Sequence, residues 1–243
     1  FFDSLNNFKL KNLKKRLFKI NVDFCLQKSA QRKKKLLISD MDGTIIENET
    51  LNDIANFLGK GDQVKKITDL GLKGRLDFST SLENRVHLLK GLRLSSLEEA
   101  KRIVTFKKGA KKLFKVLKEN NFTTVLVSGG FKPITTYVQK YLAIDYEYSN
   151  TFGVIGDLFD GTTKGQIVNA NYKEIIVNKL LKQLNIKKNQ IVGIGDAAND
   201  MNMLMSVGLP IAFKAQEIVK ANFENQINDT DLTSVLYFLG IKH

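Results

Sequence analysis

The sequence has little of several residues that would indicate particular kinds of protein. Its 243 residues include one cysteine, Cys25, two histidines, two prolines and no tryptophan. A single cysteine excludes a disulfide framework within the chain, and so few cysteines and histidines exclude a zinc site built from them. No apolar run approaches the ~18 residues that a membrane-spanning helix needs. We therefore predict a folded, non-membrane protein of a reducing compartment, the cytoplasm.

Acidic residues are fewer than basic ones, but the imbalance is local. The chain carries 38 Lys and Arg against 25 Asp and Glu, a net charge of +13. Residues 1–35 alone hold eleven Lys and Arg and two Asp, so most of the excess lies there. No aromatic pattern or basic-helix motif accompanies these charges, so we interpret them as a solvated segment and do not predict nucleic-acid binding. The alternative is a contact of this segment with nucleic acid or an acidic partner, which salt-sensitive retention on nucleic acid would test.

Short apolar runs alternate with amphipathic segments from residue 36 onward. Four runs are typical of strands buried on both faces: 36–39, 123–127, 190–194 and 209–213. Helical periodicity is found at 107–120, 133–142, 171–184 and 229–239. We expect the last helix to begin with Asp229 or Thr230 as its cap, and a hairpin to form over 151–168 around Asp160-Gly161. The alternation predicts an α/β protein with a Rossmann-like parallel sheet.

One stretch, residues 47–105, breaks this alternation because it contains helical patterns and no convincing strand. Four helices are predicted within it: 49–58, 62–70, 78–92 and 96–104. The last would start through a capping box formed by Ser96 and Glu99. We predict a helical cap inserted after the first strand, at the sheet edge where α/β proteins bind ligands. The predicted domains are thus a basic N-terminal segment of unclear role (1–33), the cap (47–105) and a two-part α/β core (34–46 with 106–243).

Polar side chains follow three of the four predicted strands. They form three clusters: Ser39-Asp40-Met41-Asp42-Gly43-Thr44, Ser128-Gly129-Gly130 and Gly195-Asp196-Ala197-Ala198-Asn199-Asp200. Each cluster alone is ordinary, since Asp-Gly forms turns, Ser-Gly-Gly forms flexible loops and Asn-Asp caps helices. Parallel strands end on the same edge of a sheet, so these distant clusters should converge. Carboxylates at two converging strand ends indicate a functional site.

The expected arrangement suits phosphoryl transfer. Asp40 and Asp196, with the Asp42 backbone nearby, offer the hard oxygen ligands that Mg²⁺ prefers. Asp40 comes first after its strand and can act as a nucleophile that forms an aspartyl-phosphate. Asp42 can protonate the leaving oxygen and then deprotonate the attacking water. Ser128 and Gly129 would donate a hydroxyl and a backbone N–H to phosphate oxygens.

These motifs, with a lysine ahead of the third, resemble those of the haloacid-dehalogenase (HAD) superfamily, and the helical insertion resembles that of its phosphoserine phosphatases. The resemblance runs from about Lys34 to the C-terminus. It implies a HAD core with a helical cap, Asp40 as nucleophile and metal ligand, and Asp42 as general acid/base whose carbonyl binds the metal, Mg²⁺. It also implies that Asp196 binds the metal, with Asp200 as a supporting carboxylate nearby, and that Ser128 and Lys173 bind the phosphate.

The resemblance also implies a small-molecule substrate, O-phospho-L-serine, hydrolysed to L-serine and phosphate in the last step of serine biosynthesis. Positions matching Glu49 and Arg85 bind the ammonium and carboxylate groups of the substrate in these phosphatases. Further implied contacts are Phe78, Gly129 and Asn199. Gly43 departs from the pattern, because many phosphoserine phosphatases have serine there. Related members hydrolyse other small phosphomonoesters or transfer the phosphoryl group to an alcohol, so these alternatives stay open, as does a homodimer.

Two other classes fit parts of the sequence. Residues 193–198 loosely match the dinucleotide-binding pattern G-x-G-x-x-A. Asp196 in that turn would face a pyrophosphate, however, and the next strand ends at Lys214 instead of an acidic ribose ligand. A phospho-accepting signalling module would also place an aspartate at a strand end, but it needs no helical cap. Turnover of a phosphate ester separates an enzyme from such a module.

Overall fold

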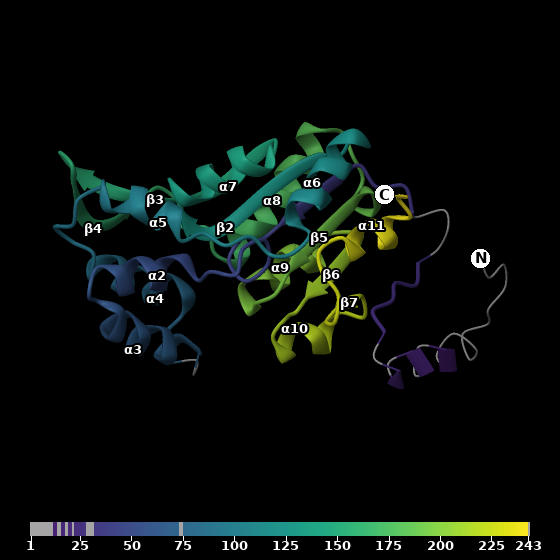
Figure 1. Cartoon of the computed structure of the whole chain (residues 1–243), viewed down its shortest axis with the longest axis horizontal. Helices are drawn as coiled ribbons and strands as arrows, with labels where there is room; N and C mark the ends of the chain where they lie inside the picture. Colours follow the sequence, from purple (N-terminus) through teal and green to yellow (C-terminus); the bar gives the residue numbers. More distant parts are fainter. Residues whose placement is uncertain are drawn as a thin grey trace.

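A single mixed sheet forms the centre of the protein (Figure 1). The computed structural model describes residues 12–13, 16–17, 19–20, 22–27, 32–72 and 75–242, so most of the predicted basic segment 1–33 lies outside the described residues. Within the described part, the sheet has seven strands in the order β4-β3-β2-β1-β5-β6-β7. All neighbours are parallel except β3 and β4. The predicted Rossmann-like parallel sheet is confirmed.

The strands are β1 (Leu36–Ser39), β2 (Thr123–Phe131), β3 (Tyr146–Ile155), β4 (Leu158–Lys164), β5 (Ile191–Gly195), β6 (Leu209–Phe213) and β7 (Gln226–Ile227). The four predicted strands are present, and β2 continues to Phe131. Neither β7 nor the first half of β3 was predicted. The first half of β3 reads Tyr-Glu-Tyr-Ser-Asn and most of its side chains are half-buried, so it lacks the apolar run of a central strand.

The predicted hairpin is present as β3 and β4, but its turn was placed wrongly. The chain turns at Gly156-Asp157, where Gly156 has φ +61°. A positive φ is readily adopted by glycine, which suits this tight turn. Asp160-Gly161, the predicted turn, lies inside β4. There the Asp160 carboxylate accepts hydrogen bonds from the N–H and hydroxyl groups of Thr162, a local pattern that the dipeptide alone does not distinguish from a hairpin turn.

The helices are α2 (Thr50–Phe57), α3 (Gly61–Leu72), α4 (Phe78–His87), α5 (Ser96–Arg102), α6 (Ala110–Glu119), α7 (Ile134–Leu142), α8 (Ala170–Gln183), α9 (Met201–Met205), α10 (Glu217–Asn222) and α11 (Ser234–Leu239). Every predicted helix has a counterpart, whereas α9 and α10 were not predicted. The predicted capping box of Ser96 and Glu99 is wrong, because Ser96 is already the first residue of α5. The residue before the helix is Ser95, and it makes no side-chain cap bond. The predicted start of the last helix is also wrong, because Thr233 is the residue before α11.

Helices cover both faces of the sheet because successive side chains of a strand point to opposite sides. In β1, Leu36 and Ile38 join the apolar cluster that includes residues of α8, α9 and α10. Leu37, between them, joins the cluster that includes residues of α6, α7 and α11. The strands are therefore buried on both sides, and their carboxyl ends remain as the edge where side chains can meet a ligand.

Helices α2 to α5 lie beyond the carboxyl end of β1, beside the β3–β4 hairpin (Figure 1). The segments that enter and leave this helical insertion pair with each other: the Glu47 N–H donates to the Thr105 carbonyl and the Lys107 N–H to the Ile45 carbonyl. The hairpin also contacts the insertion, since the Phe159 N–H donates to the Leu92 carbonyl. The insertion thus rests on both the core strands and the hairpin.

Residues 22–27 lie at the opposite end of the molecule, beside α11 (Figure 1). Asp23 accepts hydrogen bonds from the backbone N–H groups of Asn228 and Thr230, and Gln27 donates to the Phe238 carbonyl.

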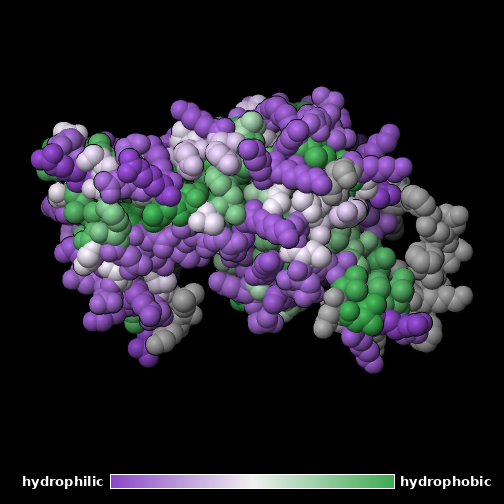
Figure 2. Space-filling model, in the orientation of Figure 1, coloured by the Kyte–Doolittle hydropathy of each residue, from purple (hydrophilic) through white to green (hydrophobic). Residues whose placement is uncertain are grey.

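Side chains on the face drawn in Figure 2 are mostly hydrophilic. Among the described residues, none of the helices combines the length and apolar content needed to span a bilayer.

Candidate active site

Three strand ends bring the predicted polar clusters together. β1 lies between β2 and β5, and Ser39 is in register with Leu126 on one side and Ile194 on the other. The Asp40 N–H extends this pairing by donating to the Ile194 carbonyl over 3.0 Å. Asp40 and Asp196 follow their strands directly, whereas Ser128-Gly129-Gly130 lies inside β2, beyond the residues that pair with β1. The three clusters still meet at one edge of the sheet, as its parallel topology predicts.

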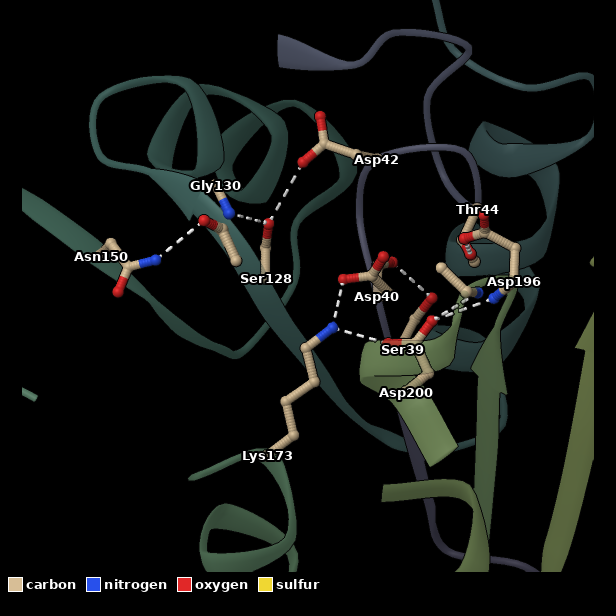
Figure 3. Close-up of polar contacts among 12 residues, drawn as sticks. Ser39, Asp40, Asp42, Thr44, Ser128, Gly130, Asn150, Lys173, Asp196 and Asp200 are labelled. Atoms are coloured by element: carbon tan, nitrogen blue, oxygen red, sulfur yellow. Dashed lines mark hydrogen bonds and ion pairs between the residues drawn. The ribbon is translucent and has the colours of Figure 1, made fainter. Parts of the chain in front are cut away.

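A buried lysine joins two of the clusters (Figure 3). Lys173 lies in the first turn of α8, and its Nζ donates to Asp40 Oδ1 over 2.7 Å and to Asp200 Oδ1 over 2.6 Å. All three residues are buried. Burial alone would lower the pKa of Lys173, but Asp200 and Asp40 raise it above its usual value, so the ammonium stays charged.

Asp196 is oriented by its neighbours in the first and third clusters. Its Oδ1 accepts a hydrogen bond from the Thr44 hydroxyl over 2.6 Å, and its backbone N–H donates to Asp200 Oδ2 over 3.0 Å. Gly43 is next to Thr44 and has φ +70°, and a Cβ there would lie 2.6 Å from Asp196 Oδ2. Glycine adopts this backbone conformation without strain and leaves room for the Asp196 carboxylate.

Three carboxylates of this edge are arranged so that they can share a cation. Oxygens of Asp40, Asp196 and Asp200 lie within 4.8 Å of one another. Burial, with the charge of Asp200, raises the pKa of Asp196 to about 7 and that of Asp40 well above its usual value. Among the described residues, Lys173 is the one cation that pairs with this cluster, so buried negative charge is in excess. Hard oxygen donors with excess charge fit a divalent cation.

Asp42 takes a different direction from Asp40 (Figure 3). Its Oδ1 accepts a hydrogen bond from the Thr50 N–H over 2.8 Å, at the start of α2, and its Oδ2 lies 3.4 Å from the Ser128 hydroxyl. The Ser128 hydroxyl oxygen in turn accepts from the Gly130 N–H over 2.8 Å. Burial raises the pKa of Asp42 above its usual value, although the bond from Thr50 opposes this. A carboxyl that keeps a proton can act as a general acid.

A pocket extends from these strand ends to the helical insertion. It is lined by Asp40, Asp42, Glu49, Phe78, Arg85, Gly129, Asp196 and Asn199, among others. Burial, with the charges of Asp42 and Asp196, raises the pKa of Glu49 to about 7, while Arg85 opposes the shift. Arg85 lies on α4 and donates from Nε to the Ser81 carbonyl one turn earlier. The pocket therefore has carboxylates at its sheet end and a carboxyl group and a guanidinium at its helical end.

Asn199 shows a polar atom that the protein itself does not satisfy. Its Oδ1 is buried and, within the described part of the chain, receives no hydrogen bond. Asn199 lines the same pocket as Asp196 and Gly129. Buried polar atoms in native proteins normally have a partner, so this oxygen is an acceptor available to a ligand in the pocket.

The predicted site residues therefore lie together, but at two depths. The pocket is lined by Asp40, Asp42, Glu49, Phe78, Arg85, Gly129, Asp196 and Asn199. Ser128, Lys173 and Asp200 are buried beneath it. Ser128 contacts the pocket residue Asp42, and Lys173 bonds to Asp200 and to the pocket residue Asp40. Sequence reasoning missed Thr44 and Thr50. Thr44 belongs to the first cluster, so its position was a usable signal, whereas Thr50 contributes a backbone N–H that no residue type reveals.

Comparison with known proteins identifies the class. The haloacid dehalogenase-like hydrolase family matches residues 34–208. The chain belongs to the haloacid dehalogenase-like hydrolases, because this match covers well over half of its length. The predicted HAD fold with its parallel sheet is confirmed by this match.

Several of the similar proteins are phosphoserine phosphatases. The probable phosphoserine phosphatase of Schizosaccharomyces pombe is 38% identical over 225 residues, which cover 91% of this chain and 76% of the relative. The phosphoserine phosphatase of Methanocaldococcus jannaschii is 35% identical over 209 residues, 86% of this chain and 99% of the relative. A solved structure described as a substrate-bound phosphoserine phosphatase complex is 36% identical with a TM-score of 0.80, and the match covers 86% of this chain and 99% of that one.

Proposed function

We propose that this chain hydrolyses O-phospho-L-serine to L-serine and phosphate through a phosphorylated Asp40. The observation that carries the proposal is the single pocket that connects Asp40 with Glu49 and Arg85. One end of this pocket has the groups that phosphoryl transfer needs, and the other has groups of opposite charge that suit an amino acid. The names of the similar phosphatases support the same substrate.

Asp40 is the proposed nucleophile. Its Oδ1 accepts a hydrogen bond from Lys173, which leaves Oδ2 to attack the phosphorus atom. The new bond joins Oδ2 to phosphorus while the bond from phosphorus to the serine oxygen breaks. The Lys173 ammonium lies against Asp40 and also balances the charge of the phosphoryl oxygens, and Ser128 donates its hydroxyl to one of them.

Asp42 is the proposed general acid and base. It gives its proton to the serine oxygen as that oxygen leaves, and it then takes a proton from the water that attacks phospho-Asp40. That attack breaks the bond between Asp40 and phosphorus, releases phosphate and restores the carboxylate. The bond from Thr50 connects Asp42 to α2, so the position of this carboxyl group depends on the helical insertion.

The carboxylate cluster is the proposed site of Mg²⁺. The ligands would be Asp40, Asp196 and the carbonyl of Asp42, with Asp200 in support through its bonds to Asp196 and Lys173. When bound, Mg²⁺ neutralises charge so that an anionic phosphate and the Asp40 carboxylate can approach each other.

The helical end of the pocket would select the amino acid part of the substrate. Glu49 would receive the ammonium group and Arg85 the carboxylate, while Phe78 supplies an apolar wall and Gly129 and Asn199 contact the substrate. In this proposal residues 47–105 act as a lid over the core formed by 34–46 and 106–243. A place in L-serine biosynthesis, a cytoplasmic location and a homodimer stay predictions.

The test is phosphate release with Mg²⁺ from O-phospho-L-serine, O-phospho-L-threonine, phosphoethanolamine, a sugar phosphate and an aryl phosphate. We expect the highest kcat/KM with O-phospho-L-serine, and loss of activity with EDTA. Activity led by another ester would contradict the roles of Glu49 and Arg85 while keeping Asp40 as nucleophile. Failure to hydrolyse any ester would contradict the proposed function altogether.

A further inference from the structure

Asn150 is a buried polar residue that the proposed mechanism does not use. It lies in β3 and is 2% exposed. Its Nδ2 donates to the Gly129 carbonyl over 2.8 Å, and its Oδ1 accepts from the Val168 N–H over 2.9 Å (Figure 3 shows the first bond). Both partners are backbone groups of fixed polarity, so the orientation of the Asn150 amide is determined by them.

On one side, Asn150 fixes the peptide that holds the Ser128 hydroxyl. The Gly129 carbonyl and the Gly130 N–H belong to the same planar peptide unit. The carbonyl accepts from Asn150, and the N–H donates to Ser128 Oγ over 2.8 Å. Rotation of this peptide would break both bonds. Because Ser128 Oγ already accepts a hydrogen bond, its own proton is directed away from Gly130, toward the pocket side where Asp42 lies.

On the other side, Asn150 fixes the start of the helix that carries Lys173. Val168 directly precedes Asn169, whose side chain accepts from the Tyr172 N–H over 3.0 Å and caps α8. The Asn169 carbonyl accepts from the Lys173 N–H over 2.9 Å. The bond from Val168 to Asn150 therefore holds the first turn of α8 against β3.

We propose that Asn150 is a positioning residue that sets the spacing between the Ser128 hydroxyl and the Lys173 ammonium. This inference rests on the proposed function, in which those two groups bind the phosphoryl oxygens. A single buried amide connects the two supporting segments, and each of its bonds goes to backbone. Asn150 touches neither the substrate nor Asp40, and acts only through Gly129 and Val168.

The test uses the substitution Asn150→Asp in the full chain. Aspartate keeps an oxygen for the Val168 N–H but puts a second oxygen against the Gly129 carbonyl, where a donor is needed. We expect kcat/KM to fall by about 10- to 100-fold, which is the size of effect that a small misplacement of a binding group produces. The loss should be equal for O-phospho-L-serine and an aryl phosphate, because the two share only the phosphoryl group. Inhibition by inorganic phosphate should weaken.

Two further measurements separate positioning from general loosening of the fold. The Mg²⁺ concentration for half-maximal activity should not change, since the carboxylate cluster does not bond to Asn150. In a Ser128→Ala background, Asn150→Asp should cost much less than in the wild type, because both changes act on the same hydroxyl. Asn225→Asp is the matched control: Asn225 also donates from Nδ2 to a strand carbonyl, that of Pro210, but lies away from the pocket.

Unchanged turnover in Asn150→Asp would overturn the inference. So would a loss that is fully additive with Ser128→Ala, or one that comes with a parallel rise in the Mg²⁺ requirement. If Asn150→Asp does not give folded protein, Asn150→Ser puts no charge in the buried site and is tested by the same measurements. A wild-type chain without activity on any phosphomonoester would overturn the proposed function and this inference with it.

Discussion

The two ends of the pocket differ in how far their charged groups are already bonded within the protein. At the sheet end, Lys173 contacts Asp40 and Asp200, and Thr44 bonds to Asp196. At the helical end, and within the described part of the chain, the Arg85 guanidinium donates to the Ser81 carbonyl of its own helix, and the Glu49 carboxylate accepts no hydrogen bond. The charged groups of the sheet end are thus held in place by other protein groups without a ligand, whereas those of the helical end are free to bind one. We infer that the first end performs the chemistry and the second selects the substrate.

The substitution Asp40→Asn should have the largest effect and tests the sheet end. The amide cannot attack phosphorus, so we expect kcat to fall below about one thousandth of the wild-type value. The fold should persist, because asparagine fills the same space and Lys173 keeps its bond to Asp200. Phosphate release and thermal unfolding measure the two expectations. Turnover near the wild-type rate would remove Asp40 as the nucleophile.

The substitution Lys173→Met should have the second-largest effect on activity. We expect kcat to fall by about 100- to 1,000-fold, since the substitution removes a fixed charge next to the phosphoryl group. It also leaves Asp40 and Asp200 buried without their ammonium partner, which costs about 3–5 kcal/mol of unfolding free energy. Denaturant unfolding measures that loss, and Mg²⁺ should restore part of it by binding the same carboxylates.

The control for Lys173→Met is Lys182→Met, on the exposed face of the same helix. It should keep both the rate and the stability of the wild type. If the two variants behaved alike, the charge of Lys173 would have no special part in the site, and the contrast between the two ends of the pocket would fail.

The substitution Arg85→Ala tests the helical end and should be selective. We expect kcat/KM for O-phospho-L-serine to fall by about 10- to 100-fold, because a charge-assisted bond to the substrate carboxylate is lost. An aryl phosphate without a carboxylate should be hydrolysed almost as before. Arg93→Ala, an exposed arginine of the insertion outside the pocket, is the matched control. Equal losses on both esters would make Arg85 a structural residue.

Substitution of Asp23, which lies outside the pocket, should have the smallest effect and serves as a reference. Burial raises its pKa, but hydrogen bonds from residues 228–230 outweigh this and lower it below 3.8. The folded state therefore gains stability from the carboxylate above pH 3.8, and loses that gain as the pH falls through the lower, folded-state pKa.

The substitution Asp23→Asn should reduce the unfolding free energy at pH 7 by at most about 1 kcal/mol, since the site is largely solvated and asparagine still accepts. Denaturant unfolding at pH 7 and below the folded-state pKa measures this difference, which should vanish at the lower pH. Phosphatase activity should not change. If the wild type and Asp23→Asn differed in unfolding free energy by the same amount at both pH values, the charge of the Asp23 carboxylate would not be the cause of the difference.

The site was more predictable than parts of the fold because its signals are residue types at strand ends. Asp40, Ser128 and Asp196 each follow an apolar run, and the sheet topology alone makes those positions meet. The first half of β3 has no such run. Tyr146 and Tyr148 alternate with Glu147 and Ser149, but this alternation is short and lacks the apolar run of a central strand, although the segment carries Asn150.

Other features depend on partners that local sequence does not show. The last helix begins at Ser234 because the preceding residues bind elsewhere: Asp23 accepts the N–H of Thr230, and Asp231 accepts that of Thr233. The Asp23 bond joins residues more than 200 positions apart. Likewise, the shared contact of Lys173 with Asp40 and Asp200 needs the complete packing of α8 against the sheet, so sequence reasoning placed this lysine on the phosphate alone.

The most direct test of the central claim is to stop the reaction with acid during turnover of O-phospho-L-serine and to locate the phosphoryl group by peptide mass spectrometry. The account predicts a base-labile phosphoryl adduct on the peptide that carries Asp40, absent from Asp40→Asn. An adduct on another residue, or steady turnover with no adduct in a quench fast enough to capture one cycle, would contradict it.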